Sequence, residues 1–496
     1  MDEIINIKRI LEVNSVKALW RAAILRDSET FELCKNRVIS DYFELLNEKN
    51  YFESYRMKKS LEAVGVIIDN SEEDFLSEYI KAETPGFSVE KDQLPVTIED
   101  CINATVTVWV DKGLKVTNGA GYADIIIGSG FFIDKRGYLI TNYHVIQDLV
   151  DPKYEGFSRA YIKLPSDMET KIPAKVIGYD SIIDLALLKV EIVPEFVFEL
   201  GSSSDLSIGD KISAIGTPIG LEGTITSGII SSTDRKLNTL GKVFQIDAAV
   251  NSGNSGGPLI DEQKRVQAVV FAGMLQFQGL NFAIPVEYLK QELPYLYKGD
   301  EINHTWIGAY GHTKKQKGTK QGLEVQYVMP GGSASFSGLR EGDIITEIDG
   351  SEIKSLEDFQ FILFNYDKDT IVKCTYKNTD DEVNTIPLLL EKRSKYPVAD
   401  IYKSDLLEDS FIPIFGMKLI HSSTINRKSY TIEKVLNGTT ADEMGFSEND
   451  PITIQDIGLD YDNNYIIAQV HVQRRKKGFI DATMTIGSYL DSPYYF

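Results

Sequence analysis

A serine inside a glycine-rich turn is the side chain of this 496-residue sequence that is best placed for covalent chemistry. Ser255 lies in Asn251-Ser252-Gly253-Asn254-Ser255-Gly256-Gly257-Pro258-Leu259. A serine hydroxyl is a weak nucleophile and needs a neighbouring base to take its proton. The glycines would let the backbone turn so that the amides of Gly253 and Ser255 point at one spot. Such a pair forms an oxyanion hole, in which the loss of one donor costs about 3–4 kcal/mol of transition-state stabilisation.

Two upstream segments supply a base and an acid. His144 follows the strand-like run Leu139-Ile140-Thr141-Asn142-Tyr143, and Asp184 opens the apolar run Leu185-Ala186-Leu187-Leu188. Histidine accepts a proton near neutral pH, and an aspartate fixes its tautomer and stabilises the imidazolium. Of the five histidines, at 144, 304, 312, 421 and 471, His144 alone falls in the β-rich part of the sequence. We therefore predict a catalytic triad of His144, Asp184 and Ser255, in the chain order of chymotrypsin-type enzymes.

Two other interpretations of the glycine-rich segments fail. Gly253-Asn254-Ser255-Gly256-Gly257 also fits the G-x-S-x-G elbow of α/β-hydrolases, but that fold needs a strand–turn–helix context and the order Ser, Asp, His. Gly128-Ser129-Gly130 is not a nucleotide-binding loop, because no G-x-G-x-x-G follows and the flanks lack a βαβ pattern. Taken singly, His144, Asp184 and Ser255 also fit structural roles, so the prediction rests on their joint occurrence.

The N-terminal part of the sequence indicates helices. Residues 1 to about 82 place apolar side chains at helical spacing, as in Ile4, Ile7 and Leu11 and then Val16, Leu19 and Trp20. Later stretches, including Glu73-Asp74-Phe75-Leu76, look similar. The apolar stripe indicates the core of a helical bundle, and we predict a helical region of unknown role over residues 1–90.

The middle of the sequence changes character after the linker Thr84-Pro85-Gly86-Phe87-Ser88. From about Val96, short runs rich in β-formers alternate with Gly and Asp turns, at 104–110, 137–140, 186–190 and 269–271. Many short strands with such punctuation predict an all-β barrel or sandwich. A helix is predicted to follow at Pro285-Val286-Glu287-Tyr288-Leu289-Lys290.

The C-terminal part contains an internal repeat with a constant offset of 107 residues and no gap. The matched pairs are Val328 with Val435, Ala334 with Ala441, Gly338 with Gly445, Leu339 with Phe446, Asp343 with Asp450, Ile345 with Ile452 and Thr346 with Thr453. Self-similarity at a fixed period predicts tandem copies of one small domain.

Charge and cysteine content exclude several functions. A formal net charge of −21 argues against a general binder of nucleic acid or anionic membrane. The basic patch Arg474-Arg475-Lys476-Lys477 is more typical of a solvated strand end or loop. Cys34, Cys101 and Cys374 lie far apart, without metal-ligand spacing and without the pattern of a disulfide framework. We predict neither a metal nor a cofactor.

The compartment is predicted from the ends and the hydropathy of the sequence. Asp2 and Glu3 stand where a signal peptide carries positive charge, and charges interrupt each apolar stretch before a membrane span forms. The chain as supplied is therefore predicted to be cytoplasmic and without a membrane span. Removal of a leader would make it periplasmic or extracytoplasmic.

The β-rich part resembles the HtrA (Deg) family of trypsin-like serine proteases over about residues 97–298. Besides the triad, the resemblance rests on Gly128-Ser129-Gly130-Phe131-Phe132-Ile133-Asp134, Gly216-Thr217-Pro218-Ile219-Gly220, Thr226-Ser227-Gly228-Ile229-Ile230-Ser231, Gln245-Ile246-Asp247-Ala248-Ala249-Val250-Asn251 and Asn281-Phe282-Ala283-Ile284-Pro285. It implies a double six-stranded β-barrel over residues 96–298, with the active site in the cleft between the barrels.

The repeated C-terminal unit resembles PDZ domains, which follow the protease domain in this family. The resemblance implies α+β domains at 303–394 and 400–496 that capture peptide C-termini by strand addition. By analogy the carboxylate loop of the first copy is Trp306, Ile307, Gly308 and Ala309, and that of the second is Ile414-Phe415-Gly416-Met417. The second copy has Asn449 where the first has Gly342, so peptide binding there is in doubt. One or both copies acting as docking modules without a ligand is the alternative.

The resemblance also implies a substrate pocket. Trypsin-like enzymes that cut after Lys or Arg resemble one another in an aspartate six residues before the serine, and here that residue is Ala249. Val250 and Leu280 would line the pocket and favour small or medium aliphatic P1 side chains. Asp247 matches a structural aspartate of the family rather than a specificity charge.

We therefore predict a serine endopeptidase that cleaves unfolded or tagged proteins in protein quality control, with PDZ domains binding peptide C-termini. The alternative is a catalytically silent peptide-binding scaffold or holdase chaperone. The family resemblance implies a homo-oligomer, a trimer assembled through the protease domain.

Overall fold

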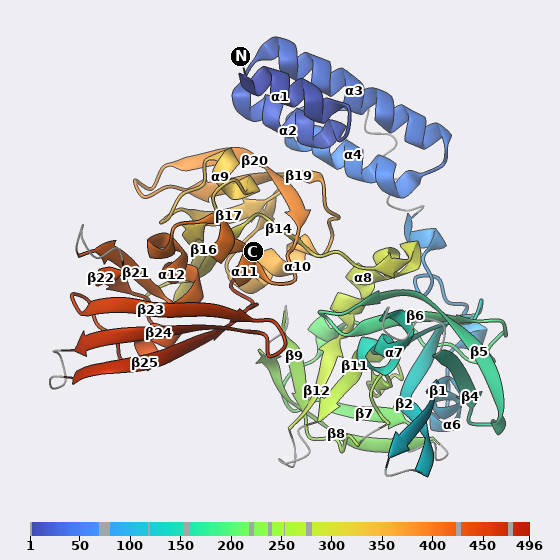
Figure 1. Cartoon of the computed structure of the whole chain (residues 1–496). Coiled ribbons are helices and arrows are strands. Elements are labelled where there is room, and N and C mark those ends of the chain that lie inside the picture. Colours follow the sequence, from blue (N-terminus) through green and yellow to red (C-terminus); the bar gives the residue numbers. More distant parts are fainter. Residues whose placement is uncertain are drawn as a thin grey trace. The chain divides into compact units, whose positions relative to one another are not determined.

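The computed structural model contains two compact units, residues 71–303 and residues 1–70 with 304–496 (Figure 1). It describes residues 2–68, 80–117, 120–151, 158–217, 223–236, 241–251, 253–273, 280–422, 428–474 and 480–496. The predicted segments at 73–76, 218–220 and 475–477 lie outside these ranges. None of the described helices is long and apolar enough to cross a membrane.

The first barrel of the unit 71–303 consists of six strands. They are β1 (Thr105–Thr117), β2 (Ala120–Asp134), β3 (Tyr138–Thr141), β4 (Arg159–Leu164), β5 (Asp167–Asp180) and β6 (Leu185–Val190). The order β5-β4-β1-β2-β3-β6 closes through β5–β6 pairing, and the short strand β13 (Asp300–Glu301) is parallel to β5. Inward-facing Val106, Val108 and Val110 alternate along β1 and are fully buried, as period-2 patterning requires.

The second barrel is also six-stranded and closed. Its strands are β7 (Lys211–Gly216), β8 (Thr224–Arg235), β9 (Val243–Ile246), β10 (Pro258–Ile260), β11 (Val266–Gly273) and β12 (Asn281–Pro285), in the order β10-β11-β12-β9-β8-β7. Besides a helical segment at residues 80–83, the described part of this unit contains α6 (Ile98–Asn103), α7 (Tyr143–Val150) and α8 (Val286–Lys298), with 3₁₀ turns η2 (Lys91–Gln93) and η4 (Ser203–Asp205). The predicted double six-stranded barrel and the predicted helix after Pro285 are confirmed.

The first copy of the repeat is a sheet with two helices. Its elements are β14 (Thr305–Trp306), β15 (Ala309–Gln316), β16 (Thr319–Val328), α9 (Ser333–Ser337), β17 (Ile344–Ile348), β18 (Ser351–Glu352), α10 (Leu356–Leu363), β19 (Thr370–Lys377) and β20 (Val383–Lys392). The strand order is β14-β20-β19-β17-β16-β15, so β15 is an edge strand of this sheet. The core includes Ile307, Leu323 and Phe359.

The second copy has the elements α11 (Pro397–Ser404), α12 (Leu407–Phe415), β21 (Met417–His421), β22 (Ser429–Val435), α13 (Thr440–Glu443), β23 (Pro451–Asp460), β24 (Tyr465–Arg474) and β25 (Ile480–Tyr489). Its sheet is a simple meander, β21-β22-β23-β24-β25. A short turn joins β23 directly to β24, where the first copy carries α10. The second copy is therefore built without a counterpart of that helix.

The repeat is nevertheless visible in the backbone. Gly342 and Asn449 both have positive φ, at 95° and 68°. Gly342 N–H donates to Val325 O and Asn449 N–H donates to Ile432 O, both at 2.8 Å. Asparagine tolerates this conformation because its short polar side chain bonds locally. The turn thus survives the replacement of glycine.

Four helices within residues 2–68 pack on the first copy of the repeat (Figure 1). They are α1 (Asp2–Leu11), α2 (Ser15–Leu25), α3 (Ser28–Asn47) and α4 (Tyr51–Ala63). Side chains of Asn14, Asp27 and Asn50 cap the last three helices by accepting backbone N–H groups. The predicted helical core is confirmed, and Ile371 and Leu389 of the first copy complete it.

Trp20 makes both polar and apolar contacts between these helices and the first copy of the repeat. It is 2% exposed, and its indole N–H lies 3.1 Å from both Ser337 Oγ and Pro387 O. Arg21 adds a guanidinium over the Phe336 ring at 4.3 Å. The N-terminal helices therefore brace the outer face of β20 and α9.

We expect Trp20→Ala to weaken this contact by about 3–5 kcal/mol, the usual cost of removing a buried aromatic side chain. Native-state hydrogen exchange should show faster opening at the amides of Ile371 and Leu389. The matched control is Phe43→Ala on α3, where the ring is 47% exposed, and its effect should stay within about 0.5 kcal/mol. Equal hydrogen exchange in both variants would contradict the stabilising role of Trp20.

Candidate active site

A histidine and an aspartate form a paired acid–base unit at one end of the first barrel. His144 lies in the first turn of α7, directly after β3, and Asp184 directly precedes β6, which pairs with β3. The backbone N–H of His144 donates to Asp184 Oδ1 at 2.8 Å, and His144 Nδ1 lies 2.7 Å from Asp184 Oδ2. Both carboxylate oxygens therefore orient the same residue.

The turn before β6 fixes the position of the Asp184 carboxylate. Asp184 has φ 65°, an unfavourable conformation for most side chains, and its carbonyl accepts a hydrogen bond from Asn142 Nδ2 at 2.8 Å. Asp180 shapes the same turn, because its Oδ1 accepts the amides of Ile182 and Ile183 at 2.7 and 3.1 Å. Burial raises the pKa of Asp184, and the hydrogen bonds from His144 oppose that rise.

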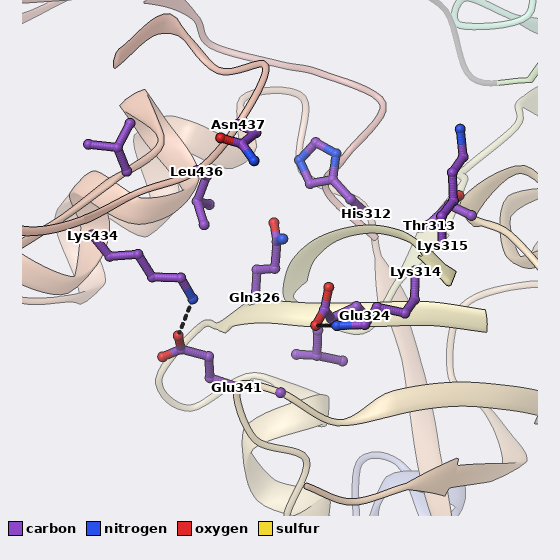
Figure 2. A pocket seen from close by; sticks show the side chains of 13 residues that line it. His312, Thr313, Lys314, Lys315, Glu324, Gln326, Glu341, Lys434, Leu436 and Asn437 are labelled. Atoms are coloured by element: carbon purple, nitrogen blue, oxygen red, sulfur yellow. Dashed lines mark hydrogen bonds and ion pairs between the residues drawn. The ribbon is translucent and has the colours of Figure 1, made fainter. Parts of the chain in front are cut away.

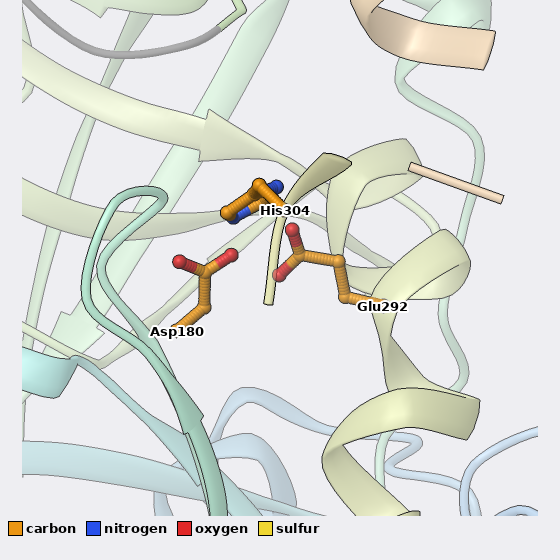
Figure 3. Close-up of side chains that lie close together, drawn as sticks. All are labelled: Asp180, Glu292 and His304. Carbon is orange, nitrogen blue, oxygen red and sulfur yellow. The ribbon is translucent and has the colours of Figure 1, made fainter. Parts of the chain in front are cut away.

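A second carboxyl group faces Asp180 from α8 (Figure 3). Glu292 is 1% exposed and Asp180 is fully buried. Burial, followed by the charge of Asp180, raises the pKa of Glu292 well above its usual range. The third side chain labelled in Figure 3, His304, belongs to the other unit, where its ring meets Phe364 edge-on at 5.2 Å.

The predicted nucleophile lies in a turn that requires glycine on both sides. Gly253 and Gly256 have φ 105° and 85°. A Cβ on Gly256 would lie 2.2 Å from Ser129 O, so a larger residue has no room there. This turn belongs to the second barrel, just before β10, and it reaches the first barrel through β2.

Ser129 of β2 anchors the turn with its backbone and its side chain. Its N–H donates to Ser255 O at 2.7 Å, and its hydroxyl donates to Gly253 O at 2.6 Å. The same hydroxyl accepts the amide of Thr217 at 3.0 Å, and Ser129 is fully buried. Our sequence reasoning considered Gly128-Ser129-Gly130 only as a nucleotide loop and a family motif. The role of Ser129 needs the contact between the barrels, which no spacing reveals.

Gly128 of β2, next to Ser129, lies close to the segments of both the predicted nucleophile and the predicted base. A Cβ at Gly128 would lie 2.6 Å from a methyl of Val145, the residue after His144, and 3.2 Å from Ser255 O. The structure thus brings the segments of all three predicted triad residues together. Ser255 Oγ donates to Phe271 O at 3.3 Å, and among the described residues no hydrogen bond joins it to His144. The Ser255 hydroxyl therefore points toward Phe271 O in this structure.

The backbone amides of Gly253 and Ser255 differ from their neighbours in hydrogen bonding. Within the part of the chain that the structure describes, neither amide donates to another group, whereas the amides of Asn254, Gly256 and Gly257 all do. Two unused donors beside the nucleophile are what an oxyanion hole requires.

Family models match most of the chain in four segments. The trypsin-like peptidase domain matches residues 128–269 and the PDZ domain matches residues 299–373. The TP0546 family PDZ domain matches residues 398–490, and a domain of unknown function (DUF8517) matches residues 1–79.

Individual relatives of the chain are named as serine proteases. A "Probable periplasmic serine endoprotease DegP-like" of Marinomonas sp. is 30% identical over 342 residues, covering 66% of this chain and 70% of the relative. The chain belongs to the HtrA (Deg) family of trypsin-like serine proteases. A relative with the same name in Bartonella henselae is 35% identical over 298 residues, or 57% of this chain and 56% of the relative. The "Putative serine protease HhoB" of Synechocystis sp. is 34% identical over 254 residues, or 47% and 59%.

The chain thus spans between half and three-fifths of the length of the Bartonella and Synechocystis relatives. Among solved structures, an "HtrA-type protease AlgW with decapeptide" is 24% identical, with 60% of this chain and 99% of that chain covered and a TM-score of 0.49.

The two residues predicted to line the substrate pocket of this HtrA-family chain lie next to strands of the second barrel, Val250 after β9 and Leu280 directly before β12. Val250 is 8% exposed and Leu280 is half-buried. Ala249 O accepts the hydroxyl of Thr226 at 2.8 Å. Asp247 Oδ1 accepts the amide of Ile229 at 2.6 Å, so this carboxylate ties β9 to β8. That bond supports the structural role predicted for Asp247.

The predicted carboxylate loop of the first PDZ domain connects β14 to the edge strand β15. Trp306, Ile307 and Ala309 are buried, and Gly308 has φ 75°. The carbonyl of Gly308 accepts the amide of Met329 at 2.8 Å, which fixes the loop. The equivalent loop of the second copy continues α12, with Gly416 at φ 84° as its C-cap.

A polar cavity of about 620 Å³ lies between the two copies of the repeat (Figure 2). One wall carries the ion pair of Lys314 with Glu324 at 2.5 Å, and another carries that of Lys434 with Glu341 at 3.6 Å. His312 points into the same space from β15. Because its charges are already paired with one another, the cavity indicates a solvated cleft between domains.

We expect Ser129→Ala to lower kcat by about tenfold to a hundredfold with little change in KM. The Gly253 carbonyl and the Thr217 amide would lose their shared partner, and a buried polar group left unpaired costs about 1–3 kcal/mol. Steady-state hydrolysis of a fluorogenic peptide measures this effect. Ser204→Ala is the matched control, since its hydroxyl bonds Ser202 at the surface. If both variants match the wild type, Ser129 does not position the turn.

Proposed function

We propose that the chain is a serine endopeptidase with Ser255 as nucleophile, His144 as general base and acid, and Asp184 as the group that orients His144. The observation that carries this proposal is the double hydrogen bond between His144 and the half-buried carboxylate of Asp184, at 2.8 and 2.7 Å. Membership in the HtrA family supports it. The two unused amides of Gly253 and Ser255 are proposed as the oxyanion hole.

In the proposed reaction Ser255 first turns from Phe271 O toward the imidazole. His144 Nε2 takes the Ser255 proton while Oγ bonds to the substrate carbonyl carbon, and the carbonyl oxygen gains a negative charge. The Gly253 and Ser255 amides donate to that oxygen. The imidazolium then gives its proton to the leaving amine as the C–N bond breaks, and water repeats the steps on the acyl-enzyme. Asp184 stays ionised and accepts Nδ1–H throughout.

The proposed specificity follows from apolar side chains near the turn. Val250 and Leu280 would line the P1 pocket, and Ala249 leaves it without a carboxylate for Lys or Arg. We propose small or medium aliphatic P1 residues in unfolded or tagged proteins, which is a quality-control role.

The two copies of the repeat are proposed to differ in function. In the first, β15 and α10 form the two sides of a peptide groove with Trp306, Ile307, Gly308 and Ala309 at its end. In the second, no helix separates β23 from β24, so one wall of such a groove is missing. We therefore propose peptide capture for the first copy and domain docking for the second.

Assembly and compartment remain proposals from the family resemblance and the sequence. We propose a homotrimer, which light scattering on the full chain tests. The cytoplasm is the proposed compartment, with the periplasm as the alternative, because the names of the Bartonella and Marinomonas relatives place those proteins in the periplasm. Cell fractionation distinguishes the two. The proposed domain limits are 1–90, 96–298, 303–394 and 400–496.

We expect the full-length chain to degrade casein, and we expect Ser255→Ala and His144→Ala to abolish degradation. Asp184→Asn keeps the shape of the turn but favours the wrong imidazole tautomer, so kcat should fall by about a thousandfold or more. A fluorophosphonate probe should label the wild type at Ser255 and leave Ser255→Ala unlabelled.

Asp247→Asn is the matched control, because its carboxylate bonds a backbone amide away from the imidazole. Casein degradation that is equal in the wild type and in Ser255→Ala would overturn the protease assignment. The silent scaffold or holdase would then be the function that accounts for the peptide-binding modules.

A further inference from the structure

The last six residues of the sequence, Asp491–Phe496, here called the tail, add a strand to the edge of the first PDZ domain. Ala309 N–H donates to Phe496 O and Phe496 N–H donates to Ala309 O, both at 2.9 Å. Gly311 N–H donates to Tyr494 O at 3.2 Å, and Tyr310 lies opposite Tyr495 in an antiparallel bridge. The tail thus pairs with the edge of β15 that β16 leaves open.

The tail side chains alternate between two faces, as they do in any strand. Phe496 is 2% exposed in the core of the first PDZ domain and meets Phe359 of α10 edge-on, with ring centroids 5.2 Å apart. Tyr494 stacks on His312 at 4.0 Å. Tyr495 faces the second copy, where its hydroxyl donates to Pro413 O at 2.6 Å.

Polar contacts hold the beginning of the tail. The guanidinium of Arg393, at the end of β20, bonds both Asp491 oxygens at 2.9 and 2.6 Å and also Ser492 O at 3.1 Å. Gln360 of α10 donates to Pro493 O at 2.5 Å. A bidentate pair of this kind fixes direction as well as distance. The tail therefore contacts β15, α10 and the end of β20 along its whole length.

From these contacts we infer that the tail is the resident ligand of the first PDZ domain in cis, so that an external peptide binds only by displacing it. The inference rests on the proposed peptide groove between β15 and α10, because the tail lies along the same strand and reaches the Ala309 end of the predicted carboxylate loop. A tethered ligand competes at an effective concentration in the millimolar range. Peptide capture by this domain is thus autoinhibited.

The displacing partner follows from the chemistry of the pockets that the tail fills. It is a peptide with one aromatic residue for the site against Phe359 and another aromatic ring two residues earlier for the face of His312. A synthetic peptide Asp-Ser-Pro-Tyr-Tyr-Phe with a free carboxylate meets both conditions and serves as the probe.

A disulfide across the bridge tests docking in the full-length chain. Ala309 and Phe496 exchange both of their hydrogen bonds, so Tyr310 and Tyr495 form the neighbouring non-hydrogen-bonded pair, in which Cα atoms lie about 4.5 Å apart. That spacing suits a disulfide. We expect Y310C/Y495C to form an intramolecular disulfide under mild oxidation, seen by mass spectrometry and as a single chain on a non-reducing gel.

The single variants Y310C and Y495C are the controls. Cys34, Cys101 and Cys374 are all buried, so they should stay reduced in every variant. Failure of the double variant to form the disulfide, while it melts cooperatively and both new thiols alkylate, would overturn the inference.

Hydrogen exchange of the wild-type protein is a second, independent test. The Phe496 amide should be protected, and excess probe peptide should expose it while β15 stays protected. An unprotected Phe496 amide in the free protein would also contradict cis docking.

Fluorescence anisotropy of the labelled probe then separates the two proposals. We expect the oxidised Y310C/Y495C protein to bind the probe at least about tenfold more weakly than the reduced protein, since the locked tail cannot leave. Equal binding in both states would place the probe elsewhere and overturn the inference, while peptide capture would stand. If Y310C/Y495C forms the disulfide but binds no probe even when reduced, the tail is confirmed as the ligand and capture of external peptides is refuted.

Discussion

The half-buried carboxylate of Asp184 is the group on which the proposed catalytic unit depends. It is held by a turn at positive φ, by Asn142 on its carbonyl and by the shaping bonds that Asp180 makes next to it. Burial raises the pKa of Asp184, and the hydrogen bonds from His144 oppose that rise. The same two donors fix the imidazole ring at the end of the first barrel. Loss of this pair would leave Ser255 without a base in the right tautomer.

The contact between the barrels is organised around one small strand segment. Gly128 and Ser129 meet α7 on one side and the Ser255 turn on the other, and they do so through backbone bonds and one buried hydroxyl. A larger residue at Gly128 would collide with Val145, and the loss of the Ser129 hydroxyl would leave two buried groups unpaired. Alignment of nucleophile and base is thus a packing property of β2 as much as a property of the three side chains.

Much of this site could be predicted from the sequence, because its chemistry is local. Ser255 among glycines, Asp184 before an apolar strand and His144 after one are short patterns with a direct physical meaning. The constant offset of 107 residues likewise predicted paired turns, which Gly342 and Asn449 now show. Contacts between distant segments left no such pattern. The bond from Ser129 to Gly253 and the packing of Trp20 on Pro387 each join residues more than a hundred positions apart.

The tail illustrates the same limit most clearly. Tyr494, Tyr495 and Phe496 follow the last strand of the second copy, so sequence order assigns them to that copy. Their partners are Ala309 and Gly311, on an edge strand whose open backbone groups accept any extended segment. Only three-dimensional placement shows which edge they choose. The first PDZ domain is therefore completed by residues that the repeat boundaries give to the second.

The central claim is that Ser255, His144 and the two amides form one reacting centre. A crystal structure of the full-length chain after reaction with a fluorophosphonate tests it most directly. The account predicts phosphorus bonded to Ser255 Oγ, with the phosphoryl oxygen about 2.7–3.1 Å from the amide nitrogens of both Gly253 and Ser255, and His144 still paired with Asp184. An adduct on another residue, or a phosphoryl oxygen remote from both amides, would contradict it.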